Sequence, residues 1–383
     1  MGLNLIAGMR REIRRMGSRK MYLGGYLVPV VFMVFFLILL SQGLPNRVPT
    51  AVVDYDNSEM SRALIRNLNT EQQLEIIEHA TTYDEAMAQV RRGTIFGFFV
   101  IPPNFQKETL RGDKPTLEFY SNLTYFIPGT LAFKGFKTAA VVTAGGVVKS
   151  VLEATGIEGA MSTPSMTFDQ FPLHNPWANY AYYMAPSFAF GLLGLMVLLM
   201  TIFSITIEIK EGTSPQWLER SNGHISMALL TKMIPHTVVW SAIGLLMVWM
   251  MFGYSHFPLA GSLGWICVAT VLMVVAYQCF GIFISSILPN PRLAFSLGAL
   301  FGILTFSFAG FSFPVQSMYG AIAIFSYAAP VRYWFLIYLN EGLNGYPVFY
   351  SRFYFAALLG FMFLYGLAMK KLRKACINPV YVP

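Results

Sequence analysis

Charged residues are scarce in this sequence, and their scarcity sets the first limit on its fold. Only 12% of the 383 residues are charged while 55% are hydrophobic, whereas soluble domains carry about 25% charged residues. The three cysteines offer no disulfide framework, because two lie in apolar runs and one lies in a basic tail. A soluble fold and a disulfide-stabilised fold are therefore excluded, and the composition indicates a membrane protein.

The sequence also lacks the residue patterns of enzymes. Its five histidines are isolated, so no two have the spacing of metal ligands on one helix face. Gly135-Phe-Lys-Thr138 and Gly146-Val-Val-Lys-Ser150 do not have the glycine spacing of a phosphate-binding loop. We expect no catalytic residue, metal or cofactor in this chain, so the energy for any transport must come from a partner or from an ion gradient.

Acidic residues, which form relays in ion-coupled carriers, are nearly absent from the apolar runs. Glu208 and Lys232 lie near the ends of their runs, and Arg332 and Glu341 lie in an irregular segment. On one continuous helix Arg332 and Glu341 would point to opposite sides, so an ion pair between them requires a helix break. The shortage of carboxylates weakens an ion-coupled carrier as an interpretation.

Six apolar runs are long enough to cross a bilayer, which takes about 20 residues. They lie near residues 21–41, 184–208, 226–253, 263–288, 293–311 and 351–369. No small-x-small cleavage site follows the first run, which therefore predicts an uncleaved transmembrane helix at 21–41 rather than a signal peptide. The predicted fold class is an α-helical polytopic membrane protein with six transmembrane helices.

Basic residues predict the orientation of these helices. They precede the first run and recur in the loop 209–225, the turn 289–292 and the tail 370–374, and cytoplasmic loops carry an excess of Lys and Arg. The N- and C-termini are therefore expected in the cytosol. The net charge of +8 is explained by these flanks and does not indicate a nucleic-acid partner.

Residues 42–180 lack this basic excess and are predicted to form an extracytoplasmic α/β domain between transmembrane helices 1 and 2. The pattern indicates strands at 49–55, 74–78, 95–101 and 117–120, and helices at 59–69, 84–92 and 104–111. Alternating strands and helices are typical of an α/β layer. A long amphipathic helix is expected from Gly129 to Ala154.

The segment 312–345, between the last two runs of the domain 181–383, is apolar but interrupted. Its interruptions include Pro314, Pro330, Arg332 and Glu341. A further full crossing would place the basic tail outside. We therefore expect a re-entrant or interfacial pair of short helices on the outer side, where irregular backbone is buried in protein or faces water.

Residues 1–20 predict an amphipathic helix on the cytosolic side. Leu5, Met9, Ile13 and Met16 share one face. The opposite face carries Arg10, Arg11, Arg14 and Arg15. Anchoring on membrane lipid and contact with another protein both fit this pattern.

The charged segment 208–220, between two long apolar runs, is the strongest local signal. Its notable residues are Glu208, Glu211, Gly212, Thr213, Trp217 and Leu218. Gly212 and Thr213 predict a helix stop followed by an N-cap, so residues 214–220 can form a short helix along the inner membrane surface. The charges alone fit a solvated helix end, but an exposed Trp217-Leu218 pair would suit a groove in a partner protein.

Small residues recur at every fourth position in two of the runs. They are Ser187 and Gly191 in the second run, and Ala294, Gly298 and Gly302 in the fifth. Small residues let helices approach closely, so they indicate either packing within the chain or a subunit interface that lines a translocation path. Phe306 is one of several phenylalanines that could line an apolar route.

Motifs along the whole chain resemble those of the permease subunits of ABC-2 type transporters, the type V ABC exporters, in the branch with a large outer domain after the first span. They are Arg11-Glu-Ile-Arg14, Val52-Val-Asp-Tyr-Asp56, the segment from Arg92 to Phe105, Glu208-x-x-Glu-Gly-Thr213, Phe313-Pro-x-x-Ser-Met318 and Ala329-Pro-x-x-Tyr333.

The resemblance implies two permeases, either two copies or a copy with a paralogue, and a dimer of cytosolic ABC ATPases that binds ATP and Mg²⁺. It makes residues 1–20 a connecting helix and residues 208–220 a coupling helix. The branch further suggests a bacterial inner membrane, a periplasmic adaptor protein docked on residues 44–180 and an outer-membrane channel.

We therefore expect the membrane subunit of an ATP-driven exporter that moves an amphiphilic, drug-like or lipid-like molecule outward. The alternative is a membrane receptor whose extracytoplasmic domain binds a ligand. A receptor requires a cytosolic output domain, which we do not expect in the short tail after residue 369.

Overall fold

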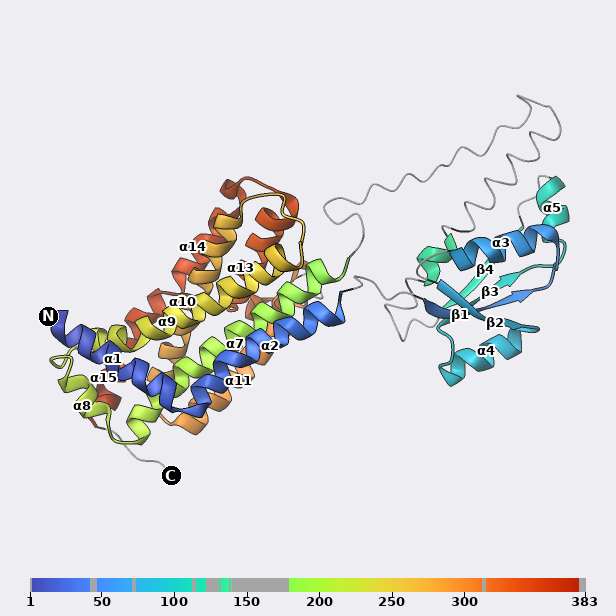
Figure 1. The fold of residues 1–383 in the computed structure, drawn as a ribbon. Helices are drawn as coiled ribbons and strands as arrows, with labels where there is room; N and C mark the ends of the chain where they lie inside the picture. The colour runs from blue at the N-terminus through green and yellow to red at the C-terminus, as the bar shows by residue number, and fades with distance from the viewer. Residues whose placement is uncertain are drawn as a thin grey trace. The chain divides into compact units, whose positions relative to one another are not determined.

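A computed structural model describes residues 2–41, 47–70, 74–111, 115–121, 179–311 and 315–378, with residues 130, 132–137 and 139. The chain divides into two compact units, Met1–Gly43 with Pro172–Pro383, and Leu44–Phe171. Each unit has its own buried apolar clusters, and Figure 1 shows their helices and strands. Most of the predicted helix at 129–154 lies outside the described residues.

The first unit is helical. Its elements are α1 (Gly2–Ser18), α2 (Lys20–Leu39), α7 (Ala181–Lys210), α8 (Ser214–Glu219), α9 (Ile225–Trp249), η1 (Met250–Tyr254), α10 (Leu263–Ile287), α11 (Pro291–Phe308), η2 (Val315–Ser317), α12 (Gly320–Tyr327), α13 (Pro330–Ile337), η3 (Tyr338–Asn344), η4 (Val348–Ser351), α14 (Arg352–Gly360) and α15 (Phe363–Ile377). The amphipathic α1, the short α8 and the end of α15 gather at one end of the unit (Figure 1).

Five helices of this unit are long and apolar enough to cross a membrane. They are Lys20–Leu39, Ala181–Lys210, Ile225–Tyr254, Leu263–Ile287 and Val348–Ile377, and they coincide with five of the six predicted runs. The polytopic helical fold class is therefore confirmed. The remaining run, 293–311, coincides with α11, an 18-residue helix that begins at Pro291 and is followed by Gly310, with a φ of 93°.

The segment between α11 and α14 is bent. α12 meets the continuous stretch of α13 and η3 at an angle of 79°, the shape of either a broken span or a re-entrant pair. Arg332 donates to the backbone oxygen of Ala309 (3.2 Å), while Glu341 accepts from the hydroxyl of Ser351 (3.3 Å). Within the described part of the chain these two residues therefore have separate partners, and Pro314 lies outside it.

Helix α7 is the central helix of the unit and packs against α2, α10 and α11. A Cβ atom placed on Gly298 of α11 would lie 2.5 Å from Ile202 of α7, and one placed on Gly302 would collide with Leu195. The glycines therefore let α11 lie directly against α7 of the same chain. At Gly298 and Gly302 the structure favours packing within the chain over a subunit interface.

The other small residues of this pattern are also buried. Ser187 donates its hydroxyl to the backbone oxygen of Tyr183 (2.6 Å), and Gly191 and Ala294 are buried. The side chain of Phe306 lies outside the described part of the structure. A path formed by these residues stays a prediction.

The second unit contains a four-stranded sheet in the order β2-β1-β3-β4. Its elements are β1 (Val48–Asp54), α3 (Glu59–Thr70), β2 (Leu74–Ala80), α4 (Tyr83–Arg92), β3 (Gly97–Ile101), α5 (Phe105–Arg111) and β4 (Glu118–Ser121). β1 is parallel to both β2 and β3, whereas β3 and β4 are antiparallel. These positions match the predicted alternation of strands and helices within a few residues.

Helices cover both faces of this sheet, with α3 on one side and α4 on the other (Figure 1). Successive side chains of a strand point to opposite faces. Val52 and Phe99 accordingly join the cluster that contains Leu64 of α3. Val53 and Phe98 join the cluster that contains Ala86 of α4. The strands β1 and β3 are therefore buried on both faces of the sheet.

Replacement of Gly298 by Leu tests the contact between α7 and α11. Overpacking a tight contact costs about 1–3 kcal/mol, so Gly298→Leu is expected to lower the midpoint of thermal unfolding of the purified protein by several degrees. Gly24→Leu is the matched control, because a Cβ on Gly24 meets no other atom within 4 Å. Equal midpoints for the two variants would contradict close packing at Gly298.

Candidate functional site

Helix α1 lies against the start of α9, and a glycine makes the contact close. A Cβ on Gly8 would lie 2.9 Å from Cβ of Thr231. The two helices are therefore so close at this point that only glycine fits on α1. Glu12 and Met16, one and two turns further along α1, are also buried. The docked face of α1 thus includes a carboxylate, which a purely apolar contact could not accommodate.

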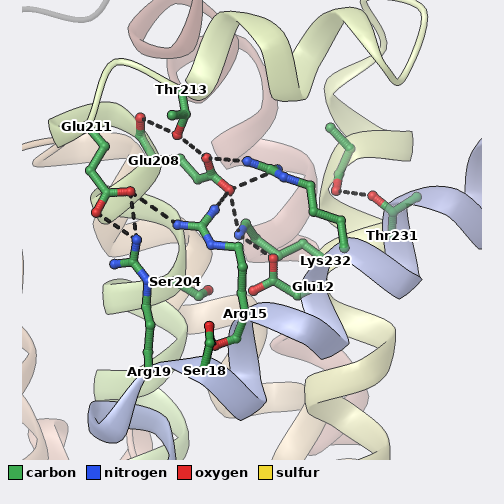
Figure 2. Close-up of polar contacts among 12 residues, drawn as sticks. Glu12, Arg15, Ser18, Arg19, Ser204, Glu208, Glu211, Thr213, Thr231 and Lys232 are labelled. Carbon is green, nitrogen blue, oxygen red and sulfur yellow. Dashed lines mark hydrogen bonds and ion pairs between the residues drawn. The ribbon is translucent and has the colours of Figure 1, made fainter.

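Glu208, on the last turn of α7, is the centre of the site (Figure 2). Its side chain is fully buried, and both of its oxygens accept hydrogen bonds from Arg11 of α1, at 3.1 and 3.2 Å. Arg15 donates to the same carboxylate, as do Lys232 of α9 at 3.1 Å and the hydroxyl of Thr213. Glu208 therefore joins α1, α7, α9 and the turn before α8.

A second buried carboxylate, that of Glu12, is connected to Glu208 through Lys232. Glu12 is only 2% exposed, and its oxygens accept from Lys232 (2.8 Å) and contact the His236 ring nitrogen Nε2 (3.1 Å). The other ring nitrogen of His236 lies 2.7 Å from the hydroxyl of Tyr26 on α2. Lys232 is thus shared by two carboxylates and lies 5.3 Å from the centre of the Trp217 ring.

Glu211 extends the network toward solvent. Its carboxylate accepts from Arg19 at 2.7 and 2.8 Å and from Arg15 at 3.4 Å, and these groups are partly exposed. Exposed pairs contribute roughly 0–1 kcal/mol. Glu211 therefore adds little to the free energy that holds α1 compared with the buried Glu208 and Glu12.

The electrostatics of Glu12 follow from its surroundings. Burial by itself raises the pKa of its carboxyl, but the Lys232 ammonium and the hydrogen-bonded His236 ring lower it by more, so the pKa falls from 4.5 to about 2. Glu12 is therefore ionised in the folded protein at neutral pH. Removing one member of a buried ion pair costs about 3–5 kcal/mol, because the remaining charge is left without a partner.

The turn between α7 and α8 is shaped by Gly212 and Thr213. Gly212 has a φ of 67°, a left-handed conformation that glycine adopts without strain, and it ends α7 as the sequence predicts. Thr213 occupies the predicted N-cap position of α8, but its hydroxyl makes no capping bond to that helix. The hydroxyl donates to the Glu208 carboxylate.

The prediction of an exposed Trp217-Leu218 pair is also wrong. Both side chains are buried in an apolar cluster with Ile225 of α9 and Leu372 of α15, and Ser214 fixes α8 to the backbone oxygen of Cys376 (3.0 Å). Burying a tryptophan and a leucine against the chain's own helices removes more apolar area from water than leaving them free. The exposed residues of α8 and its end are Gln216, Glu219 and Arg220.

The faces of helix α1 also differ from the prediction. Ile13 is exposed, as is Ile6, while Arg11 and Arg15 point inward to Glu208. Arg10 and Arg14 remain exposed. The inward face of α1 was not recognised as polar because two arginines there pair with a carboxylate that lies 197 and 193 positions away in the chain.

Sequence reasoning did not identify Glu12, His236 or Arg19 as site residues, although it noted that Lys232 lies near the end of its run. The sequence did contain a signal that pairs Glu12 with Lys232. Lys232 is the one Lys or Arg in the run 226–253, and Glu12 is the one acidic residue before the first run. An isolated charge in an apolar run and an isolated opposite charge next to another run are each costly without a partner.

No group of three or more His, Cys, Asp or Glu side chains that could hold a metal ion occurs among the residues that the structure describes. The two central carboxylates instead have cationic partners. The arrangement can hold helices together and transmit a displacement between them.

The fold and this site define a multi-pass membrane protein in which an amphipathic N-terminal helix is fastened to the end of a central span. Residues 20–369 match the family model described as ABC-2 family transporter protein, so the chain belongs to the ABC-2 transporter family. It is 22% identical over 293 residues to the inner membrane transport permease YhhJ of Escherichia coli K12 and to that of Shigella flexneri, covering 72% of each chain. The protein is thus a membrane permease of an ABC transporter, a family that implies an ABC ATPase partner.

Replacement of Glu208 by Gln tests the centre of the network. The change leaves Arg11, Arg15 and Lys232 without their shared carboxylate, so α1 is expected to detach from α9. In a background without native cysteines, spin labels at the exposed positions Ile13→Cys and Val238→Cys should report one narrow α1–α9 distance, and Glu208→Gln should broaden that distribution severalfold. Glu219→Gln, on the exposed face of α8, is the control. An unchanged distance distribution in Glu208→Gln would show that the carboxylate does not hold α1.

The pKa of Glu12 predicts how the contact responds to acid. Its folded-state pKa lies below the ordinary value, so ionised Glu12 stabilises docking above pH 4.5, and this contribution is lost as the pH falls toward 2. Spin labels at Ile13→Cys and Val238→Cys should report one α1–α9 distance from neutral pH down to about 4.5 and a broadening distribution below it. Glu12→Gln should already be broad at neutral pH. A transition near neutral pH in the unaltered protein would contradict the assignment.

Proposed function

We propose that this permease exports an amphiphilic, drug-like or lipid-like molecule, driven by a cytosolic dimer of ABC ATPases that binds the ATP and Mg²⁺. The observation that carries the proposal is the buried carboxylate of Glu208. It ties the connecting helix α1 to α7, α9 and the turn before α8. A force applied to α8 would reach three long helices through one set of charge-assisted hydrogen bonds.

The ATPase would contact the exposed residues Gln216, Glu219 and Arg220. Trp217 and Leu218 would serve as the inner side of α8 and pass its movement to α9 and α15, with which they share a cluster. Glu208, Glu211 and Thr213 would couple that movement to α1. This division keeps the predicted coupling segment at 208–220 but assigns its aromatic residue to transmission instead of to docking.

The same reasoning supports an orientation. Basic residues flank the charged end of the unit, in α1, in the α7–α9 connection and after residue 369, and such residues are retained in the cytosol. We infer that the N- and C-termini are cytosolic and that residues 42–180 are extracytoplasmic. The α/β unit would then be available to a periplasmic adaptor protein and, through it, to an outer-membrane channel.

A second permease, either another copy or a paralogue, would complete the transporter. The face of α11 turned away from α7 carries exposed apolar side chains, including Leu293, Leu300 and Ile303. Two such faces could meet in the bilayer or face lipid. We place the outward route between the two permeases, bordered by α7 and α11, and expect the predicted re-entrant segment at 312–345 near its outer end.

Inside-out membrane vesicles that contain the permease with its co-purified ATPase test this function. Export from the cytosol predicts that ATP drives an amphiphilic fluorescent dye into the vesicle lumen. Glu208→Gln should lower the initial rate at least tenfold while the ATPase still co-purifies, and Glu59→Gln, an exposed carboxylate in the α/β unit, should leave it unchanged. ATP-driven loss of dye from the lumen, or a normal rate in Glu208→Gln, would contradict the proposal.

A further inference from the structure

A second feature of the helical unit is a basic groove at the end where α8 and the end of α15 gather (Figure 1). It has a volume of about 710 Å³ and is bordered by the end of α7, the turn between α10 and α11, and the end of α15. Ile287 and Leu293 line it near the turn, and Lys371 and Lys374 line it from α15. None of the charged residues of the network around Glu208 lines this groove, so it is a separate site.

Two lysines give this groove a positive charge. Lys371 and Lys374 are three positions apart on α15, so they lie on the same face of the helix, and both are exposed. In the described part of the chain neither ammonium group forms a hydrogen bond or an ion pair, and no acidic side chain lines the groove. Helix α11 also begins here, with Asn290 as its N-cap, and the N-terminal end of a helix favours an anion. The positive charge of the groove is therefore uncompensated.

The rest of the groove is apolar and continues along the helices. Ile287, the last residue of α10, is 46% exposed, and Leu293 of α11 is 56% exposed. Leu297 lies one turn further along α11 on the same face, and it is exposed as well. Because α10 is a candidate membrane span, these side chains lie beside the acyl chains of one leaflet. The groove thus combines positive charge at the membrane surface with an apolar strip that runs into the hydrocarbon.

This combination fits an anionic phospholipid better than a soluble protein. An acidic protein surface would match the two lysines, but it would not match the isoleucine and leucine side chains that border a membrane span. A phospholipid matches both parts, since its phosphate lies at the membrane surface and its acyl chains lie in the hydrocarbon. Basic pockets between transmembrane helices bind such head groups. A zwitterionic head group has no net charge, so the lysines favour an anionic lipid.

We propose that this groove binds an anionic phospholipid of the adjacent leaflet. The phosphate oxygens accept hydrogen bonds from the ammonium groups of Lys371 and Lys374, and an acyl chain lies along Leu293 and Leu297. In the orientation inferred above, this leaflet is the cytosolic one. The bound lipid joins the end of α15 to the turn between α10 and α11, and its binding does not depend on the export proposed above.

Two photoactivatable lipids with identical acyl chains test the site, a phosphatidylglycerol and a phosphatidylcholine, each with a diazirine in one chain. The purified full-length permease, in nanodiscs of unlabelled phosphatidylcholine, is irradiated with each probe at the same low concentration, and labelled residues are located by peptide mass spectrometry. Phosphatidylglycerol should label the residues that line the groove about five times more than phosphatidylcholine, a preference that corresponds to about 1 kcal/mol. Equal labelling by the two lipids would overturn the proposal. Loss of the preference when inorganic phosphate is added at constant ionic strength would assign the groove to a soluble anion instead.

Lys371→Gln with Lys374→Gln should bring the ratio of the two labels in the groove close to one, whereas Lys371→Arg with Lys374→Arg keeps both charges and should keep the preference. Lys370→Gln with Arg373→Gln is the matched control, because it removes the same charge from exposed positions of α15 that do not line the groove. This control should also keep the preference, and an equal loss in both glutamine pairs would show only a general attraction to the basic tail.

The same labelling of the permease with its co-purified ATPase separates a lipid from a protein occupant. The preference for phosphatidylglycerol in the groove should persist in this complex. Its loss there would assign the groove to the ATPase and overturn the proposal.

Discussion

A carboxylate buried at the end of a membrane-spanning helix requires cations beside it, and this requirement organises the helical unit. Glu208 is fully buried, and two arginines from α1 and a lysine from α9 surround it. Glu12 is also buried, and its partner there is the same Lys232, which forms ion pairs with both carboxylates. Neither α1 nor the start of α9 could lie where it does without the opposite charge, since an isolated ion at this depth costs several kcal/mol.

The network gives the permease a joint at the end where the ATPase is proposed to act. Charge-assisted hydrogen bonds fix directions as well as distances, so α1, α7 and α9 can move together when α8 is displaced. The apolar cluster around Trp217 fastens α8 to α9 and α15 from the other side. The exposed face of α8 is left polar, as expected for a surface that binds and releases a soluble partner.

Much of the fold was predictable from local patterns. Five of the six spans predicted from apolar runs coincide with helices long enough to cross a membrane, the spacing of strands and helices matched the elements of the α/β unit, and Gly212 marked the end of α7. What failed depends on contacts between distant segments. Trp217 was expected to be exposed because its burial partners, among them Leu372, are remote in the chain. The polar contact of α1 was missed because the sequence does not show that Arg11 pairs with Glu208. Hydrophobic periodicity cannot show which charges meet.

Hydrogen–deuterium exchange of α1 tests the joint most directly. If the buried network holds α1 against α9, the backbone amides of residues 5–18 should exchange slowly in the unaltered protein. They should exchange more than about 100-fold faster in Lys232→Met, which leaves Glu12 without its main partner, a change that costs about 3–5 kcal/mol. Amides that exchange equally fast in both proteins, at the rate of a helix lying freely on the membrane surface, would contradict the account.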